Sequence, residues 1–349
     1  MAVDAPATET PLSPAGGPRR RGGIARRAGR EHGSPALGRW GRRRASRAEP
    51  TGRSAASPVP PVFKHRLLPA ALILPEVVVV VIFFIWPSGK ALLEAFRQSN
   101  AFGLGARFSG LANFGSALHG GYLQAVEVTA TFTAITTLVS MGISLFLAVQ
   151  VESTGRLRPV YRTLFIWTYA VPGAIGAALW LFLFEPKVGP GARALEALGV
   201  HWNFALSGTQ AFALVCALTI WQQSAYNFVF FSAGLQSIPD AVVEAATMDG
   251  AGPVTRFWKV VFPLLGPTVL FVTVSDVLAA LFGSFAVIDV ISQGGPGGST
   301  TTLVYMLYRD GFQNGDVGLA GAESMLLFVL AGALLVVQFK VFNRRVHYR

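Results

Sequence analysis

The stretch Glu244-Ala245-Ala246-Thr247-Met248-Asp249-Gly250 lies between two strongly apolar segments. Before it, Ser237-Ile238-Pro239-Asp240 is typical of a helix start, with a hydroxyl cap, a proline in the first turn and a carboxylate near the positive end of the helix dipole. Gly250 suits the left-handed conformation that often follows a helix. We expect a second short helix from Pro253 to Phe262, ended by Pro263 because proline cannot continue the hydrogen-bond ladder. The sequence therefore predicts two short helices joined by a turn.

The order of residues in this stretch resembles the EAA loop of ABC-transporter permease subunits. The matching positions are Glu244, Ala245, Ala246, Gly250 and Pro263, with Val260 and Phe262 as conservative departures from the family's usual ending. The resemblance implies that the loop, about 237–263, couples the permease to a separate ATPase subunit. Two short helices can enter a groove of such a partner as one rigid unit. The residues expected at this contact are Glu244, Ala245, Ala246, Asp249, Gly250 and Pro263.

Three further stretches resemble the glycerol-3-phosphate uptake permeases in the carbohydrate branch of that family. They are Tyr226-Asn227-Phe228 with Gly234-Leu235-Gln236-Ser237-Ile238-Pro239, then Gly294-Gly295-Pro296, and the tail from Val337-Gln338-Phe339 to Arg345-Val346-His347-Tyr348. The resemblance covers roughly residues 67–349. It implies a sugar or sugar-phosphate-like solute, with glycerol-3-phosphate or a glycerophosphodiester as the best match. Another sugar or an oligosaccharide is the alternative.

The composition is that of a membrane protein with a basic tail. Of the 349 residues, 52% are hydrophobic and 13% are charged, whereas about a quarter of the residues of a soluble domain are charged. Residues 1–66 hold fourteen Lys or Arg against four acids, so most of the net charge of +11 belongs to the tail. Because residues 1–62 contain few large apolar side chains, we predict a disordered, Arg-rich cytoplasmic tail there. Residues 63–349 form the expected transmembrane domain.

Six apolar segments follow the tail, each near the roughly 20 residues that a helix needs to cross a bilayer. We place them at 67–88, 126–150, 162–184, 210–235, 265–291 and 320–342, with a kink at Pro172. With both termini inside, the cytoplasmic parts hold 23 Lys or Arg and the outer loops six, which is the direction that the positive-inside rule expects. The predicted fold class is therefore all-α: a polytopic membrane protein with six transmembrane helices and a cytoplasmic helix-turn-helix coupling loop.

Motifs for catalysis or metal binding are not found in the sequence. Gly89-Lys90 lacks the upstream glycine and the following hydroxyl of a phosphate-binding G-x-x-x-x-G-K-[ST] loop, and the five His are scattered. The single Cys216 excludes an intrachain disulfide. We therefore expect a protein that is not an enzyme, binds no metal or cofactor of its own, and depends on ATP hydrolysis by partner subunits.

Several polar residues fall inside the predicted spans. They are Gln222, Gln223, Tyr226, Asn227 and Asp276. A carboxylate at a helix centre costs about 2.5–3.5 kcal/mol on insertion scales, so Asp276 should face the interior of the bundle or a water-filled path. Two roles stay open for these side chains, because they could line the substrate path or form hydrogen bonds between helices. Trp180 and Trp221 could stack on a sugar, whereas Glu323, near a segment end, is expected to reach water or the lipid headgroups.

The resemblance implies an assembly rather than a single chain. The expected partners are a second permease subunit in a heterodimer, two ATPase subunits at the cytoplasmic face, an extracytoplasmic solute-binding protein and the lipid bilayer. The expected location is the cytoplasmic (inner) membrane of a bacterial cell, with both termini inside. Two other classes stay as alternatives: a non-ABC secondary transporter that uses Asp276 as a proton site, and a membrane anchor whose Arg-rich tail binds nucleic acid. The loop at 237–263 could then be an ordinary amphipathic loop on the membrane surface.

Overall fold

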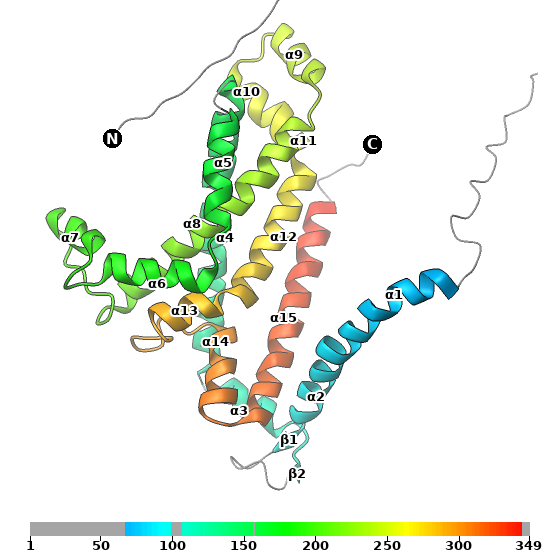
Figure 1. Ribbon diagram of the computed structural model, residues 1–349, viewed down its shortest axis with the longest axis vertical. Helices are drawn as coiled ribbons and strands as arrows, with labels where there is room; N and C mark the ends of the chain where they lie inside the picture. The colour runs from blue at the N-terminus through cyan, green and yellow to red at the C-terminus, as the bar shows by residue number, and fades with distance from the viewer. Residues whose placement is uncertain (1–66, 99–106, 120, 156–157, 344–349) are drawn as a thin grey trace, which may run out of the picture. The chain divides into compact units, whose positions relative to one another are not determined.

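The structure is a computed structural model that describes residues 67–98, 107–119, 121–155 and 158–343. The basic tail predicted at 1–62 lies outside these residues. The described chain is largely helical (Figure 1). Its two-residue strands β1 (Arg97–Gln98) and β2 (Arg107–Phe108) pair in an antiparallel ladder. The predicted all-α class is confirmed.

Helices follow one another along the described chain. In the first half they are α1 (Leu67–Val80), α2 (Trp86–Glu94), α3 (Ala112–His119), α4 (Tyr122–Ser153), α5 (Arg158–Tyr169), α6 (Gly173–Phe184) and α7 (Pro190–Ala197). In the second half they are α8 (Gly208–Gln236), α9 (Asp240–Met248), α10 (Pro253–Arg256), α11 (Phe262–Leu264), α12 (Gly266–Gly283), α13 (Phe285–Ile291), α14 (Leu303–Tyr308) and α15 (Val317–Asn343). The π-helical turns η1 (Val81–Ile85), η3 (Phe257–Val261) and η4 (Arg309–Gln313) continue neighbouring helices.

Within the described ranges, four helical stretches are long and apolar enough to cross a membrane. They are Ala71–Glu94, Tyr122–Ser153, Gly266–Gly283 and Val317–Phe342. A fifth span results if the bent pair of α5 and α6 counts as one. α8 has 29 residues, which is about 44 Å at 1.5 Å per residue, but its Gln and Asn side chains make it less apolar than these four. The count of six spans therefore stays a prediction.

The helices α4, α8, α12 and α15 form a packed bundle (Figure 1). α8 packs on α4, α4 on α12, and α12 on both α8 and α15. The contact between α8 and α12 depends on Gly234, because a Cβ atom there would lie 2.7 Å from Thr268 Oγ1 and 3.0 Å from Leu265 Cδ2. Small residues at helix contacts let backbones approach closely in membrane proteins. A side chain at position 234 is therefore expected to push α8 and α12 apart.

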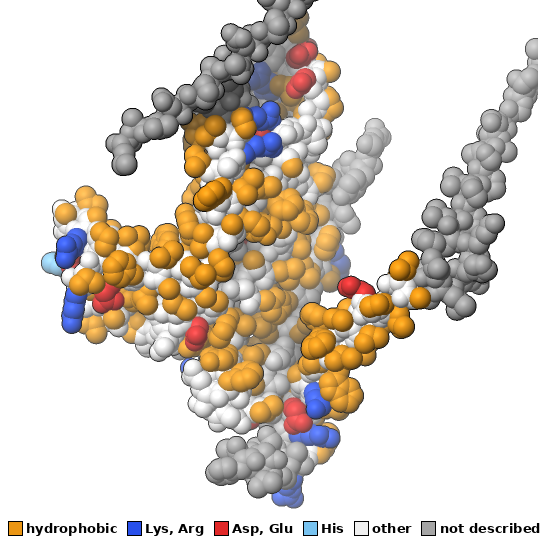
Figure 2. Space-filling view, in the orientation of Figure 1, with side chains coloured by type: hydrophobic (Ala, Val, Ile, Leu, Met, Phe, Trp, Pro, Cys, Tyr) orange, Lys and Arg blue, Asp and Glu red, His pale blue; other side chains and the backbone are white. Residues whose placement is uncertain are grey.

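The surface of the described domain carries many large apolar side chains. Figure 2 shows them over most of the visible helical surface. The most apolar window of Ala71–Glu94 contains no buried residue, and Phe83 and Trp86 in it are 68% and 65% exposed. In water such a surface would favour aggregation, whereas in a bilayer lipid or another membrane subunit covers it. The exposure pattern therefore agrees with the membrane class predicted from composition.

The third predicted span, 162–184, is divided into two helices. α5 and α6 meet at an angle of 92°. Pro172, between them, has extended backbone (φ −59°, ψ 143°), and a proline cannot donate the hydrogen bond that would continue α5. The kink predicted at Pro172 is present as a sharp corner. The fifth predicted segment, 265–291, is likewise divided at Ser284 into α12 and α13.

The prediction that Pro263 ends a helix is wrong. The helix continues through Leu264, because the π-helical turn η3 ends two residues before the proline. The amide of Phe262 bonds to the carbonyl of Phe257, five residues back. A proline ring clashes with a carbonyl of the preceding turn in a regular α-helix, and the wider π turn takes up that disturbance. The same arrangement, with η1 as the π turn, precedes Pro87.

Replacing Gly234 by alanine should destabilise the contact between α8 and α12 by about 1–3 kcal/mol, because the added methyl group would overlap Thr268 and Leu265. Gly332 on α15 is the matched control, since nothing lies within 4 Å of a Cβ atom there and alanine is the better helix former. Thermal unfolding of the two variants, purified in detergent, measures both effects. An unchanged midpoint for Gly234→Ala would show that α8 and α12 do not pack at this glycine.

Candidate functional site

Residues 240–264 contain the two short helices that the sequence predicts, and we call this segment the hairpin. α9 and α10 form its two arms, and Gly250 between them has φ +78°. A residue with a Cβ atom rarely adopts this left-handed conformation, so the conformation predicted for Gly250 is confirmed. Arg256 Nη1 donates a hydrogen bond of 2.7 Å to Thr247 Oγ1. This bond joins the two arms of the hairpin.

The hairpin begins differently from the prediction. Ser237 does not cap α9, because it follows the last turn of α8, where its hydroxyl donates a hydrogen bond of 2.7 Å to the carbonyl of Gly234. Pro239 precedes α9 with extended backbone and makes no side-chain cap bond. Asp240 lies in the first turn of α9 as predicted, where the helix dipole favours a negative charge. α8 therefore leads into the hairpin through residues 237–239 alone.

Most of the hairpin surface is exposed. Of the residues predicted to contact the ATPase, those that are exposed are Glu244, Ala245, Asp249, Gly250 and Pro263, and Ala246 is half-buried. Sequence reasoning missed Met248, Val254 and Trp258, which are 87%, 70% and 57% exposed. Large apolar side chains beside exposed charges are typical of a surface that contacts another protein. The pattern of residues in so short a helix does not tell whether an apolar side chain packs inward or faces a partner.

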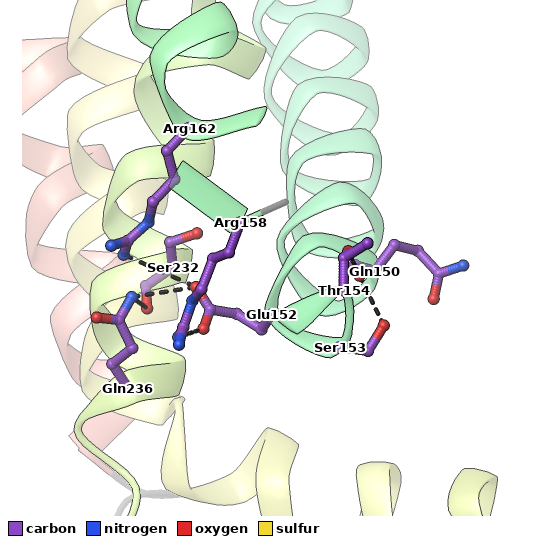
Figure 3. A network of polar contacts seen from close by, with 8 residues as sticks. All are labelled: Gln150, Glu152, Ser153, Thr154, Arg158, Arg162, Ser232 and Gln236. Carbon is purple, nitrogen blue, oxygen red and sulfur yellow. Dashed lines mark hydrogen bonds and ion pairs between the residues drawn. The ribbon is translucent and has the colours of Figure 1, made fainter. Parts of the chain in front are cut away.

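A cluster of charges around Glu152 lies at the end of α8 that leads into the hairpin (Figure 3). Glu152 of α4 forms ion pairs with Arg158 and with Arg162, the second at 3.7 Å, and accepts a hydrogen bond of 3.0 Å from Gln236 Nε2. The two arginines belong to α5 and Gln236 is the last residue of α8. The Glu152 cluster therefore joins the ends of three helices. A pocket of about 570 Å³ is lined by residues of this cluster and of the hairpin.

A second polar cluster is buried inside the bundle. Asp276 of α12 is 1% exposed, and its Oδ2 accepts hydrogen bonds from Asn227 Nδ2 at 2.6 Å and from Ser140 Oγ at 3.1 Å. Asn227 is fully buried on α8 and Ser140 on α4. A buried carboxylate is tolerated where hydrogen bonds replace its contacts with water. The side chain of Asp276 thus connects three helices.

A pocket of about 360 Å³ lies against Asp276, and we call it the Asp276 pocket. Its lining comes from α8 and α12 and from the corner between α5 and α6, and consists of Gln222, Gln223, Tyr226, Ser275, Asp276, Ala279, Tyr169, Val171 and Gly173. Gln223 Nε2 donates a hydrogen bond of 3.4 Å to the backbone carbonyl of Asp276. Gln222 packs against Gly176 of α6, where a Cβ atom would come within 2.8 Å of Gln222 Nε2. The corner at Pro172 therefore places α6 against one side of the pocket.

Known proteins resemble the chain in sequence and in fold. Residues 140–348 match the model of the family described as binding-protein-dependent transport system inner membrane component. The chain belongs to this family.

Relatives within the family are similar over almost their whole length. The sn-glycerol-3-phosphate transport system permease protein UgpA of Agrobacterium fabrum is 44% identical over 82% of this chain and 98% of its own. The protein of the same name from Yersinia pseudotuberculosis is 43% identical over 84% and 100%. A bacterial ABC transporter that imports alginate has a similar fold, with a TM-score of 0.70 at 20% identity over 80% of this chain and 96% of its own. The predicted identity as an ABC-importer permease is confirmed.

The polar residues predicted inside the spans of the permease fall into two groups. Gln222, Gln223 and Tyr226 line the Asp276 pocket, whereas Asn227 bonds to Asp276 between the helices. Asp276 belongs to both groups. Trp180 and Trp221 are not among the lining residues, and their ring centroids lie 5.9 Å apart. Hydrogen bonding between helices is therefore observed, and passage of a solute along these residues stays a prediction.

The prediction that Glu323 of the permease reaches water or the lipid headgroups is wrong. Its side chain is 2% exposed, and both carboxylate oxygens lack a hydrogen-bond partner among the residues that the structure describes. The reason lies in the chain before α15. α14 and η4 pack against α15, so a residue near the end of the apolar segment is still enclosed. Across the described ranges, no group of three or more His, Cys, Asp or Glu is arranged to hold a metal ion.

The Glu152 cluster should stabilise the permease as a unit. Glu152→Gln removes the charge that faces Arg158 and Arg162, and we expect it to cost about 1 kcal/mol, the upper range for partly exposed ion pairs. Arg158→Gln should cost a similar amount. The double variant should lose less stability than the sum of the two single losses, because both changes break one shared contact. Thermal unfolding of the purified variants measures these differences. Fully additive losses would contradict the cluster.

Proposed function

We propose that this permease forms one half of the membrane channel of an ABC importer for glycerol-3-phosphate or a glycerophosphodiester. The proposal rests on sequence identity. The chain is 44% and 43% identical to two permeases named for sn-glycerol-3-phosphate transport, over 98% and 100% of their lengths. The Asp276 pocket is the candidate contact with the solute. Its volume of about 360 Å³ is within the range of about 300–1,000 Å³ that is typical of small-molecule sites.

The hairpin is the proposed contact with the ATPase subunits. Its exposed surface presents Glu244 for a basic group of the partner, and the apolar side chains of Met248 and Trp258 for burial. The hairpin continues directly from α8, and the Glu152 cluster joins that end of α8 to α4 and α5. α8 also carries Gln222 and Tyr226 of the pocket. A push on the hairpin would therefore move one wall of the Asp276 pocket.

The proposed assembly contains a second permease, two ATPase subunits and an extracytoplasmic binding protein. One permease with at most six spans is too small to surround a path that closes at either side, so a heterodimer supplies the second half. The most apolar window of Ala71–Glu94 holds no buried residue, which is consistent with a surface covered by lipid or by that partner. A related fold occurs in an alginate ABC transporter in complex with a periplasmic protein. The Lys and Arg distribution supports an orientation with the hairpin and both termini inside the cell.

Reconstitution of the complete importer in proteoliposomes tests this function. Uptake of glycerol-3-phosphate should require ATP and the ATPase subunits, and vanadate should block it. Uptake that persists with vanadate and stops when the proton gradient is collapsed would instead support a secondary transporter. A complex that carries only neutral sugars would leave the ABC mechanism intact and overturn the proposed solute.

Charge reversal at the hairpin should uncouple ATP hydrolysis from transport. In Glu244→Lys the protein should insert into the membrane as before, whereas stimulation of the ATPase by the loaded binding protein should fall by about tenfold or more, since loss of one charged contact of about 1.4 kcal/mol corresponds to that factor. Glu196→Lys is the matched control, because Glu196 is exposed on α7. Normal stimulation in Glu244→Lys would contradict the proposed contact.

A further inference from the structure

The Asp276 pocket has a mostly apolar surface, but several of its lining residues carry hydrogen-bonding groups and none of them is a cation. Two amides, a carboxylate, a hydroxyl and two phenols face it, and neither Lys nor Arg is among its lining residues. Tyr169 and Tyr226 form an aromatic part of the wall, with ring centroids 5.6 Å apart. Polar groups around an aromatic wall suit a solute that has hydroxyl groups on a short carbon chain.

Two amide atoms at this pocket are buried without a hydrogen-bond partner. They are Gln222 Nε2, a donor, and Gln223 Oε1, an acceptor, and neither has a partner within the described chain. Buried polar atoms in folded proteins are nearly always paired, so an unpaired donor and acceptor at one pocket point to a ligand that supplies both. A hydroxyl group donates and accepts, whereas the oxygens of a phosphate dianion only accept. The pair of amides therefore matches a polyol better than a phosphate.

The surroundings of Asp276 likewise favour a hydroxyl group over a phosphate in this pocket. The hydrogen bonds that its side chain accepts from described residues, those of Asn227 and Ser140, both reach Oδ2. These bonds come from neutral groups, so no cation is paired with the side chain. A phosphate ester carries about −1.5 to −2 charges at pH 7, and neither Lys nor Arg is among the lining residues to compensate them. The pocket therefore offers no cation to a phosphate, whereas Asp276 can accept a hydrogen bond from a hydroxyl.

We propose that the Asp276 pocket binds the hydroxyl-bearing glycerol end of the solute, and that the phosphate faces away from it, toward the second permease. This assignment rests on the proposed function. Gln222, Gln223 and Asp276 bind the hydroxyl groups, and the ring of Tyr226 packs against the carbon chain. Because neither Lys nor Arg lines this pocket, we expect the groups that attract the phosphate to lie on the partner subunit. The solute thus has a fixed orientation between the two halves.

Protection of a pocket cysteine from a thiol reagent tests this orientation. The binding protein is left out, so its own selectivity for solutes does not affect the result. Ala279→Cys is placed in the pocket lining, with Cys216→Ser removing the single native thiol. The reconstituted complex with both permeases and the ATPase subunits is labelled with a thiol reagent in the presence of glycerol, glycerol-3-phosphate or inorganic phosphate. Glycerol and glycerol-3-phosphate should slow the labelling, and inorganic phosphate should not. Ser324→Cys, in the groove between α2 and α15, is the control that none of them should protect.

Two variants then separate the roles of the pocket residues. In Gln222→Leu, the glycerol concentration for half protection should rise by about tenfold or more, because one hydrogen bond of the buried site is lost. In Ser275→Arg, which adds a cation to the lining, inorganic phosphate should begin to protect Ala279→Cys, a gain that misfolding cannot produce.

Other outcomes would overturn the assignment. Protection by inorganic phosphate in the unmodified pocket, equal to that by glycerol, would place the phosphate end here. Lack of protection by every compound, in a complex that still transports glycerol-3-phosphate, would show that the pocket is not a binding site. If glycerol protects but the complex does not transport glycerol-3-phosphate, the proposed solute is wrong and the hydroxyl site remains.

Discussion

The hydrogen bonds of Asp276 are the constraint on which the bundle depends. A carboxylate inside an apolar helix is stable only where other groups replace water around it, and Asn227 and Ser140 do so from two further helices. The register of α4, α8 and α12 is thereby restricted, since a shift of one residue would leave the carboxylate without these partners. Because the same side chain borders the Asp276 pocket, the bond that holds the helices together also sets the chemistry of the space beside them.

α8 connects the two regions that we assign to function. One end continues through residues 237–239 into the hairpin, and its central part carries Gln222, Gln223 and Asn227. The Glu152 cluster joins the hairpin end of α8 to α5, and α5 leads to the corner at Pro172 that borders the same pocket. Two routes, α8 itself and α5, therefore run from the hairpin to the pocket. Such an arrangement can transmit a movement of the hairpin at the membrane surface to the walls of the Asp276 pocket.

Features that depend on a short stretch of chain could be predicted from the sequence. The left-handed glycine at position 250, the corner at Pro172 and the inward position of Asp276 each follow from a rule that concerns one residue and its neighbours. Features that depend on distant residues could not. Glu152 meets Gln236 only because α4 and α8 pack together, and Glu323 is buried only because η4 and α14 fold against α15. Pro263 was misjudged for a local reason, since a π turn lets a helix accept a proline.

Transport by this route requires that movement of the hairpin changes access to the Asp276 pocket. The most direct measurement is the labelling of Ala279→Cys, in a Cys216→Ser background, by a membrane-impermeant thiol reagent added to either side of the reconstituted importer. If the hairpin controls this access, trapping the ATPase subunits with vanadate should raise the labelling rate from one side and lower it from the other. Labelling rates that stay the same from both sides, in a complex that hydrolyses ATP, would contradict this control.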